Sequence, residues 1–277
     1  MARPPRLEIP DAIYHASARG DERAAIYWDD GDRRQFCELL AEVGEGFRWR
    51  ILAYCLMTNH YHLLTQTPEP NLAQGMRQLN GVYAQGFNRK HGRVGHIFQG
   101  RYGARLVQAD EHLRAAVRYI VRNPVNAGLC REPQGWRWSS HRAALGLERR
   151  RFLATATLLA YYGPTPAQAR ERYRAHVEQE SERERSAHAL VDGDDSFVAS
   201  TLEHLTPGPG IPRRYFRLPR PPLAELLEPG DADAIASAHD RGYSLREIAR
   251  HLGVNASTVS RRLRRRRAVN WNATRTT

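Results

Sequence analysis

Hydrophobic and polar residues follow two different spacings along the first half of the chain. Alternating or continuous apolar runs predict β-strands at residues 12–18, 47–57, 60–66 and 105–107. Apolar residues that recur every three or four positions predict helices at residues 32–45, 71–90 and 110–122. We expect Asn71 and Asp110 to cap the second and third helices, and Asn123-Pro124 to end the third.

The resulting order is β-α-β-β-α-β-α. This order is typical of a ferredoxin-like or RRM-like α+β sandwich, in which helices cover an antiparallel sheet. The strand at residues 60–66 is expected near the middle of that sheet.

The pattern changes after Ser139-Ser140-His141. Residues 146–190 are charged and helical in spacing, and the proline-rich residues 206–222 predict an extended linker. A small all-α module begins near residue 230. The sequence therefore predicts a first domain at residues 1–145, a helical extension and linker at 146–228, and a second domain at 229–277.

Composition indicates an anionic partner. The 277 residues carry a formal net charge of +12, almost all of it from arginine, with Lys90 as the only lysine. Arginine is suited to bidentate contacts with phosphate and guanine, so nucleic acid is the expected partner. The three separated cysteines suggest no disulfide framework, and the chain has no apolar signal core or membrane-length run. We expect a cytoplasmic protein without a membrane partner.

Two histidines at alternate positions are the first candidate for chemistry. His60 and His62 project from the same face of the predicted strand, with Tyr61 on the other face. Two neutral imidazoles can hold a divalent metal ion with further ligands, but a half-exposed strand with no ligand is the simpler alternative. Tyr119 and Asn123 share a helix face four residues apart, so a phenol nucleophile and an amide ligand can lie together. From this spacing alone, an ordinary core or surface tyrosine is the simpler alternative.

Six segments together resemble the HUH single-tyrosine transposases, in the branch of REP-associated tyrosine transposases. They run in order over about residues 11–145: YHASARG at 14–20, LMTNHYHLL at 56–64, NGVYAQGFN at 80–88, GHIFQGRY at 95–102, RYIVRNPVNAGL at 118–129 and WRWSSH at 136–141. One departure is Thr58, which stands where many relatives have proline. It is not a ligand position.

The resemblance implies roles for four residues. Tyr119 matches the catalytic tyrosine, His60 and His62 match the metal-binding histidines, and Asn123 takes the place of an amide ligand. The metal would be Mg²⁺ or Mn²⁺. The substrate would be single-stranded DNA at a hairpin, cleaved through a 5′-phosphotyrosine link that leaves a 3′-OH and can be reversed.

Further residues are candidates for DNA contacts or rival roles. Phe98 and Tyr102 can stack on unpaired bases, with loop anchoring as the alternative. Tyr83 and Tyr102 are rival nucleophiles, but neither has an amide one turn later in such a helix. The arginines expected to bind DNA are Arg19, Arg101, Arg105 and Arg118.

The C-terminal module resembles the helix-turn-helix domains of bacterial regulators and resolvases. Ser244 and Glu247 form a predicted capping box, Gly253 allows the turn, and Asn255 or Ser257 can cap the next helix. That helix would enter the major groove of duplex DNA, where Arg264–Arg267 would contact phosphates. The alternative is an ordinary helical hairpin. The residues available for duplex contacts are Ser257, Thr258, Ser260, Arg261 and Arg262.

The sequence favours a metal-dependent single-stranded DNA endonuclease and strand transferase. One alternative is a DNA-binding regulator that keeps the fold without catalysis. Another is a hydrolytic metalloenzyme, which would need a further acidic or histidine ligand; Glu69 lies outside the usual spacing. The target DNA, the preferred metal, the base-reading residues, a mobile or domesticated role and a monomeric or dimeric state stay open.

Overall fold

The computed structural model describes residues 7–179, 190–203, 222–227, 232–241 and 243–263. By their contacts these residues form two compact units, one within Arg6–Glu184 and the other within Arg185–Thr277.

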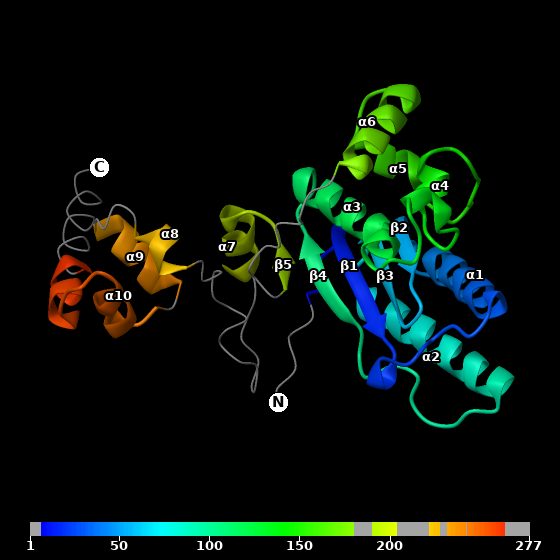
Figure 1. Ribbon diagram of the computed structural model, residues 1–277, viewed down its shortest axis with the longest axis horizontal. Coiled ribbons are helices and arrows are strands. Elements are labelled where there is room, and N and C mark those ends of the chain that lie inside the picture. Colours follow the sequence, from blue (N-terminus) through cyan, green and yellow to red (C-terminus); the bar gives the residue numbers. More distant parts are fainter. Residues whose placement is uncertain (1–6, 180–189, 204–221, 228–231, 242, 264–277) are drawn as a thin grey trace. The chain divides into compact units, whose positions relative to one another are not determined.

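The first unit follows the order of strands and helices that the sequence predicts, which confirms the α+β class. Figure 1 labels its α-helices and strands. In chain order the elements are β1 (Ala12–Arg19), the 3₁₀ turn η1 (Asp21–Arg23), α1 (Asp30–Gly46), β2 (Arg50–Leu56), β3 (His60–Thr67), α2 (Leu72–His91), β4 (Gly103–Val107), α3 (Glu111–Asn126), the 3₁₀ turn η2 (Pro133–Gly135), α4 (His141–Ala144), α5 (Thr155–Ala160) and α6 (Pro166–Glu178).

The strands of this unit are antiparallel and lie in the order β2-β3-β1-β4. β1 pairs with β3 on one side and with β4 on the other, and β2 pairs with β3. β3, which carries both candidate histidines, is therefore an interior strand, as the sequence predicts. In the register of β1 and β3, His60 lies opposite Arg19 and His62 lies opposite Ser17.

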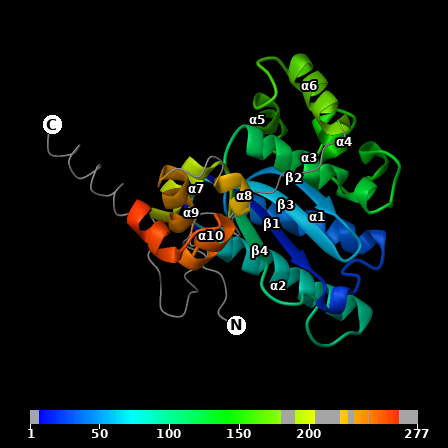
Figure 2. The same cartoon turned by 60° about the vertical axis from the view of Figure 1, so that its left-hand side comes forward.

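Helices cover both faces of the sheet (Figures 1 and 2). α1 and α2 lie on one face, where the ring of Phe36 is 4.7 Å from that of Tyr61 and the Tyr61 hydroxyl donates to Asn80. α3 lies on the other face and shares one apolar core with the strands. That core contains Ile13, Leu64 and Val107 of the strands and Leu113, Ala116, Val117, Ile120 and Val121 of α3.

Two predicted caps differ from the structure. Asn71 precedes α2, but its side chain accepts from the Trp49 indole and donates to the Phe47 carbonyl. The carboxylate of Glu8 accepts from the Ala73 N–H instead, at 2.6 Å. Asp110 precedes α3 with φ +66° and makes no capping hydrogen bond. Glu8 has thus replaced Asn71 as the cap of α2, and the positive φ of Asp110 accompanies the missing cap of α3.

The predicted end of the third helix is wrong. α3 continues through Pro124 to Asn126. Proline removes one helical hydrogen bond, but the Pro124 ring is buried, and the Ala127 and Leu129 N–H groups bond the Asn123 and Pro124 carbonyls. Because α3 continues past Asn123, the Asn123 side chain lies one helical turn after that of Tyr119.

The first unit extends beyond residue 145, where the sequence places a domain boundary. Tyr162 of the α5–α6 connection, and Tyr173 and Val177 of α6, belong to the same apolar core as α3. The Arg122 guanidinium also donates to the Val177 carbonyl at 3.0 Å, near the C-terminal end of α6. α5 packs on α6 and β2, and α6 packs on α3, so both helices are part of this unit.

The second unit contains the predicted helical module. Its elements are β5 (Val191–Asp192), α7 (Asp195–Glu203), α8 (Leu223–Leu226), α9 (Ala232–Asp240), α10 (Leu245–His251) and a helix at residues 256–263. The capping box of Ser244 and Glu247 is confirmed, and Gly253 has φ +66° in the turn after α10. Residues 206–221 of the predicted linker and Arg264–Arg267 lie outside the described residues.

Among the described residues, none of the helices has the length and hydropathy that crossing a membrane requires. Cys37, Cys55 and Cys130 are free thiols.

Candidate functional site

The candidate site begins with the alternation of β3. His60 and His62 face α3, with ring centroids 5.0 Å apart, while Tyr61 faces α1 and α2. His62 is 8% exposed and His60 is half-buried. The sheet itself therefore holds two imidazoles side by side beneath one helix.

The hydrogen bonds of His60 fix its proton. The Asn59 amide nitrogen donates to the Arg23 carbonyl at 2.9 Å, so the Asn59 Oδ1 must face His60 Nδ1, which is 2.7 Å away. His60 Nδ1 therefore donates, and the neutral ring carries its lone pair on Nε2. Burial, together with the charge of Arg19, lowers the pKa of His60 and keeps the ring neutral.

The hydrogen bonds of His62 also fix the position of its proton. The Asn123 Nδ2 lies 3.3 Å from His62 Nε2, and an amide nitrogen can only donate, so His62 Nε2 accepts. His62 Nδ1 then donates to His15 Nε2, 2.9 Å away on β1. His62 thus turns a lone pair toward Asn123 of α3. This is the form of imidazole that binds a cation.

α3 brings Tyr119 and Asn123 to the histidines. The Tyr119 ring centroid is 5.4 Å from that of His62 and 5.9 Å from that of His15. The Asn123 side chain bonds His62 and also hydrogen-bonds His60. Tyr119 and Asn123 are both half-buried, at the border of the face that α3 packs into the core. The structure therefore brings together all four residues of the predicted site.

These residues suit a divalent cation. Two neutral imidazole nitrogens and an amide oxygen can ligate such an ion, with water or phosphate oxygens completing the shell. Each imidazole is also oriented by a hydrogen bond from its other ring nitrogen, His62 to His15 and His60 to Asn59.

His15 is a site residue that the sequence reasoning missed. It is 8% exposed and lies on the same sheet face as Ser17, two positions later. His15 lies in the segment at residues 14–20, which belongs to the family resemblance, but no local pattern pairs it with His62. Only the register of β1 against β3 brings the two rings together.

The four arginines expected to bind DNA lie in different places. Arg19 is exposed and lies opposite His60, and Arg105 lies opposite His15 on the same face. The charge of Arg118 instead acts on Tyr162 and His176, on the side of α5 and α6. Arg101 lines a pocket on the α2 side of the sheet. Only Arg19 and Arg105 border the candidate site.

The rival nucleophiles lie away from the histidines. Tyr83 is fully buried on the α1–α2 side, where its hydroxyl donates to the Ile26 carbonyl, and burial raises its pKa far above the ordinary value. Tyr102 lines the same pocket as Arg101. Neither is in contact with His60 or His62 through any interaction found in the described residues.

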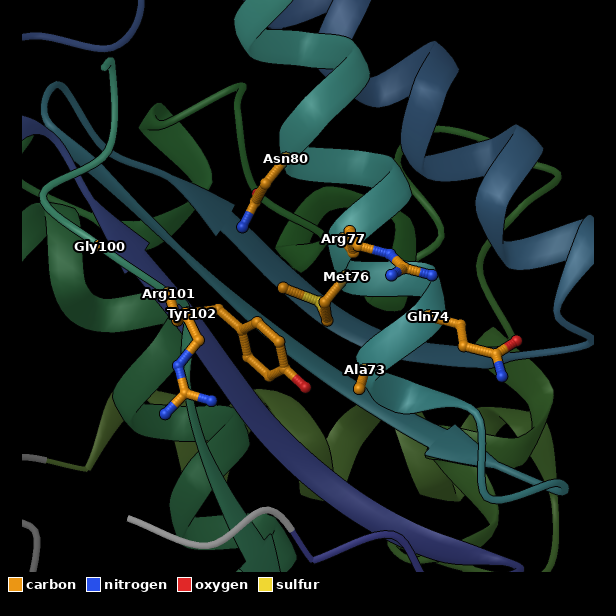
Figure 3. Close-up of a pocket in the computed structure, with 8 residues that line it drawn as sticks. All are labelled: Ala73, Gln74, Met76, Arg77, Asn80, Gly100, Arg101 and Tyr102. Carbon is orange, nitrogen blue, oxygen red and sulfur yellow. The ribbon is translucent and has the colours of Figure 1, made fainter. Parts of the chain in front are cut away.

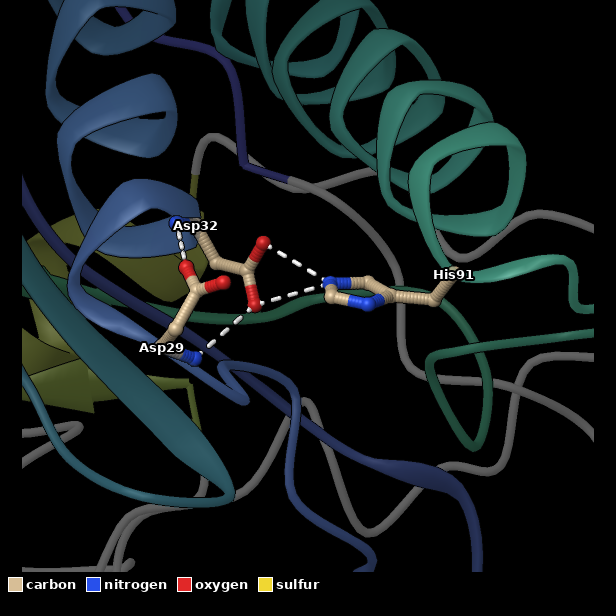
Figure 4. A group of neighbouring side chains, drawn as sticks. All are labelled: Asp29, Asp32 and His91. Carbon is tan, nitrogen blue, oxygen red and sulfur yellow. Dashed lines mark hydrogen bonds and ion pairs between the residues drawn. The ribbon is translucent and has the colours of Figure 1, made fainter.

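A second group of possible ligands, Asp29, Asp32 and His91, lies at the start of α1 and the end of α2 (Figure 4). Asp29 and Asp32 form the capping box of α1. The Lys90 ammonium lies 2.8 Å from Asp29 Oδ2 and 2.7 Å from Asp32 Oδ1, and His91 Nε2 lies 2.9 Å from Asp32 Oδ1. A cation of the protein already occupies this position, so we assign the group to joining α1 and α2.

The helix at residues 256–263 carries the residues predicted to contact duplex DNA. Ser257, Arg261 and Arg262 are exposed, and Thr258 is half-buried. Val259 faces inward and packs with Ile248 and Ala249 of α10. The polar residues therefore lie on the side of the helix that the core leaves open.

Comparisons with known proteins find chains that resemble this one. A family model described as "Transposase IS200 like" matches residues 8–123, and one described as "Helix-turn-helix domain" matches residues 230–266. A Haemophilus influenzae protein whose name assigns it to the REP-associated tyrosine transposases is 32% identical over 117 residues, which cover 38% of this chain and 66% of the relative. A solved structure of a REP-associated tyrosine transposase bound to a REP hairpin aligns with a TM-score of 0.46 at 21% identity, over 54% of this chain and 89% of that one.

Proposed function

Since residues 8–123 form a transposase domain of the IS200-like family and residues 230–266 a helix-turn-helix domain, we propose that the protein cleaves and rejoins single-stranded DNA through Tyr119. The observation that carries the proposal is the convergence of Tyr119 and Asn123 on His62, at 5.4 Å between ring centroids and 3.3 Å between atoms. These residues are about sixty positions apart in the sequence and meet in one place.

In the proposed reaction the Tyr119 Oη attacks a backbone phosphorus of the DNA. A tyrosine–phosphate bond forms, the bond from phosphorus to the 3′ oxygen breaks, the phenol loses its proton and the 3′ oxygen gains one. A 3′-OH can attack the phosphotyrosine in the reverse sense, so the energy of the phosphodiester is kept and no ATP is consumed. The products are a 5′-phosphotyrosine link and a free 3′-OH.

The metal site is part of this proposal. His60 Nε2, His62 Nε2 and Asn123 Oδ1 would hold Mg²⁺ or Mn²⁺, which would polarise the phosphate under attack. His15 is a positioning residue, because its bond to His62 Nδ1 sets both the tautomer and the orientation of that ring. Arg19 and Arg105 border the site and would bind the phosphates on either side.

We propose hairpin-forming repeats as the substrate, as the resemblance of residues 14–141 to the REP-associated tyrosine transposases implies. The helix-turn-helix would bind duplex DNA and deliver the first unit to its target, with Ser257, Thr258, Arg261 and Arg262 on the contacting helix. Such a protein would work at the nucleoid.

The test is covalent capture. Purified protein is mixed with Mn²⁺ and labelled hairpin oligonucleotides copied from the DNA that flanks the coding region, then separated under denaturing conditions. Wild type should form an adduct and Tyr119→Phe should form none while binding the same DNA with similar affinity. An adduct with Tyr119→Phe would assign the nucleophile elsewhere. Binding without an adduct in wild type would favour a regulator that has kept the fold.

A further inference from the structure

A pocket of about 510 Å³ lies between α2 and the segment that leads into β4 (Figure 3). It is separate from the candidate site, because it lies on the α1–α2 side of the sheet. Asn80 shows this placement, because it lines the pocket and accepts a hydrogen bond at 2.6 Å from Tyr61, which faces α1 and α2. The lining residues are Ala73, Gln74, Met76, Arg77, Asn80, Gly100, Arg101 and Tyr102.

The pocket has an apolar floor and a cationic rim. Met76 is fully buried and Tyr102 is 9% exposed, whereas Arg77 and Arg101 are exposed. Figure 3 shows the two guanidinium groups extending from opposite sides, one from α2 and one from the segment before β4. An apolar surface beside two arginines suits a ligand with a flat ring and an anionic group.

Amide groups add the capacity to recognise polar edges. The Asn80 Oδ1 is engaged by the Tyr61 hydroxyl, so the group that Asn80 can offer is Nδ2. Gln74 is exposed at the same rim. Asparagine and glutamine amides are the side chains that pair with the edges of nucleobases. The nearby carboxylate of Glu8 is engaged by the Ala73 N–H and caps α2.

The pocket lies at the level of His62 in the sheet. Tyr102 directly precedes Gly103, which pairs with Ser17 of β1, and Ser17 pairs with His62 of β3. Two strand spacings, about 10 Å, separate Gly103 from His62 across the sheet. A few unpaired nucleotides beyond a phosphate held at the histidines are long enough to reach the other face.

We propose that this pocket binds one unpaired nucleobase and its phosphate from the strand engaged at Tyr119. The base lies on the accessible part of the Tyr102 ring, its edge meets the amides of Asn80 and Gln74, and Arg77 and Arg101 bind the phosphate. The proposal rests on the proposed function, since it takes single-stranded DNA as the ligand. It assigns to this face of the domain a role in holding the strand, apart from cleavage.

Photocrosslinking tests the contact directly. Full-length protein is irradiated with a thymidine oligonucleotide that carries 5-iodouracil, and the crosslinked peptides are identified by mass spectrometry. The expected crosslink is at Tyr102. Crosslinks that fall only outside the pocket would overturn the proposal.

A matched pair of variants tests the affinity. Arg77 and Arg89 are both exposed arginines of α2, but only Arg77 lines the pocket. Arg77→Ala should weaken binding of the labelled oligonucleotide, measured by fluorescence anisotropy, about tenfold more than Arg89→Ala. Equal losses would mean that only net charge matters and would refute the pocket.

The adduct assay separates this proposal from the proposed function. If wild type forms the Tyr119 adduct but the two arginine variants behave alike, the pocket proposal fails and the proposed function stands. If crosslinks form at Tyr102 but wild type gives no adduct, the base-binding pocket stands and the proposed chemistry fails.

Discussion

His15 of β1 and His62 of β3 share a hydrogen bond of 2.9 Å between Nε2 and Nδ1, with ring centroids 5.0 Å apart. The bond commits one nitrogen of His62 to the protein and leaves the other directed toward Asn123. A candidate metal ligand on an interior strand is thus held by a residue of the neighbouring strand. The pair links the architecture of the sheet to the chemistry of the site.

Removal of His15 should weaken metal binding. Without its partner, the His62 ring loses the bond that sets its tautomer, so His15→Ala should lower the affinity for Mn²⁺ by about 10- to 100-fold. Calorimetric titration of the full chain with Mn²⁺ measures this. His112→Ala, which removes a half-buried imidazole from the start of α3, is the control and should leave the affinity unchanged. Unchanged Mn²⁺ affinity in His15→Ala would show that His15 does not position the ligand.

The group of Asp29, Asp32 and Lys90 should contribute stability and bind no metal. Asp32 is buried, and hydrogen bonds from Lys90 and His91 outweigh the effect of burial and lower its pKa. Asp32→Asn removes these pairs and should lower the free energy of unfolding by about 2 kcal/mol. Asp30→Asn changes an exposed carboxylate that lies 3.8 Å from Arg33 and 3.6 Å from Arg137, and it should cost no more than about 0.5 kcal/mol. Urea unfolding measures both, and a gain in wild-type stability from added Mn²⁺ that Asp32→Asn alone abolishes would contradict this assignment.

Stability should fall in mild acid because of His141. Burial lowers the pKa of His141 from 6.5 to about 4, and the charge of Arg174 acts in the same direction. Above pH 6.5 the ring is neutral in both states; below it the unfolded chain takes up a proton first, so stability is lost as the pH falls to about 4. This loss should be about 3 kcal/mol.

The control for this pH dependence is His141→Asn, whose amide can still reach the Tyr173 hydroxyl that lies 2.9 Å from His141 Nδ1. Urea unfolding at several pH values should give a flatter dependence in the variant. If both proteins lose the same free energy between neutral pH and pH 4, His141 is not the responsible group.

Truncation should reveal where the first unit ends. A chain that stops after residue 145 loses Tyr173 and Val177 and exposes the α3 surface that they cover. A buried aromatic residue alone is worth about 3–5 kcal/mol, so this chain should lose cooperative thermal unfolding. A chain that stops after residue 179 should unfold cooperatively, as followed by circular dichroism. Cooperative unfolding of the shorter chain would place the boundary at 145.

The sequence by itself determined most of the local elements and four of the candidate site residues, His60, His62, Tyr119 and Asn123. Alternation placed His60 and His62 on one face of a strand, and helical spacing placed Tyr119 and Asn123 on one side of a helix. The capping box of Ser244 and Glu247 was likewise readable, because the two residues contact each other within one turn. Such features depend on backbone geometry over a few residues, which the sequence specifies directly.

Tertiary structure decided which residues of different strands and helices contact each other. The partnership of His15 with His62 depends on the β1–β3 register, and the continuation of α3 through Pro124 depends on burial of the proline ring. Glu8 replaces the expected cap of α2, and the apolar faces of α5 and α6 are buried by packing on each other, on β2 and on α3. These outcomes follow from packing summed over distant segments, which no local pattern of residues contains.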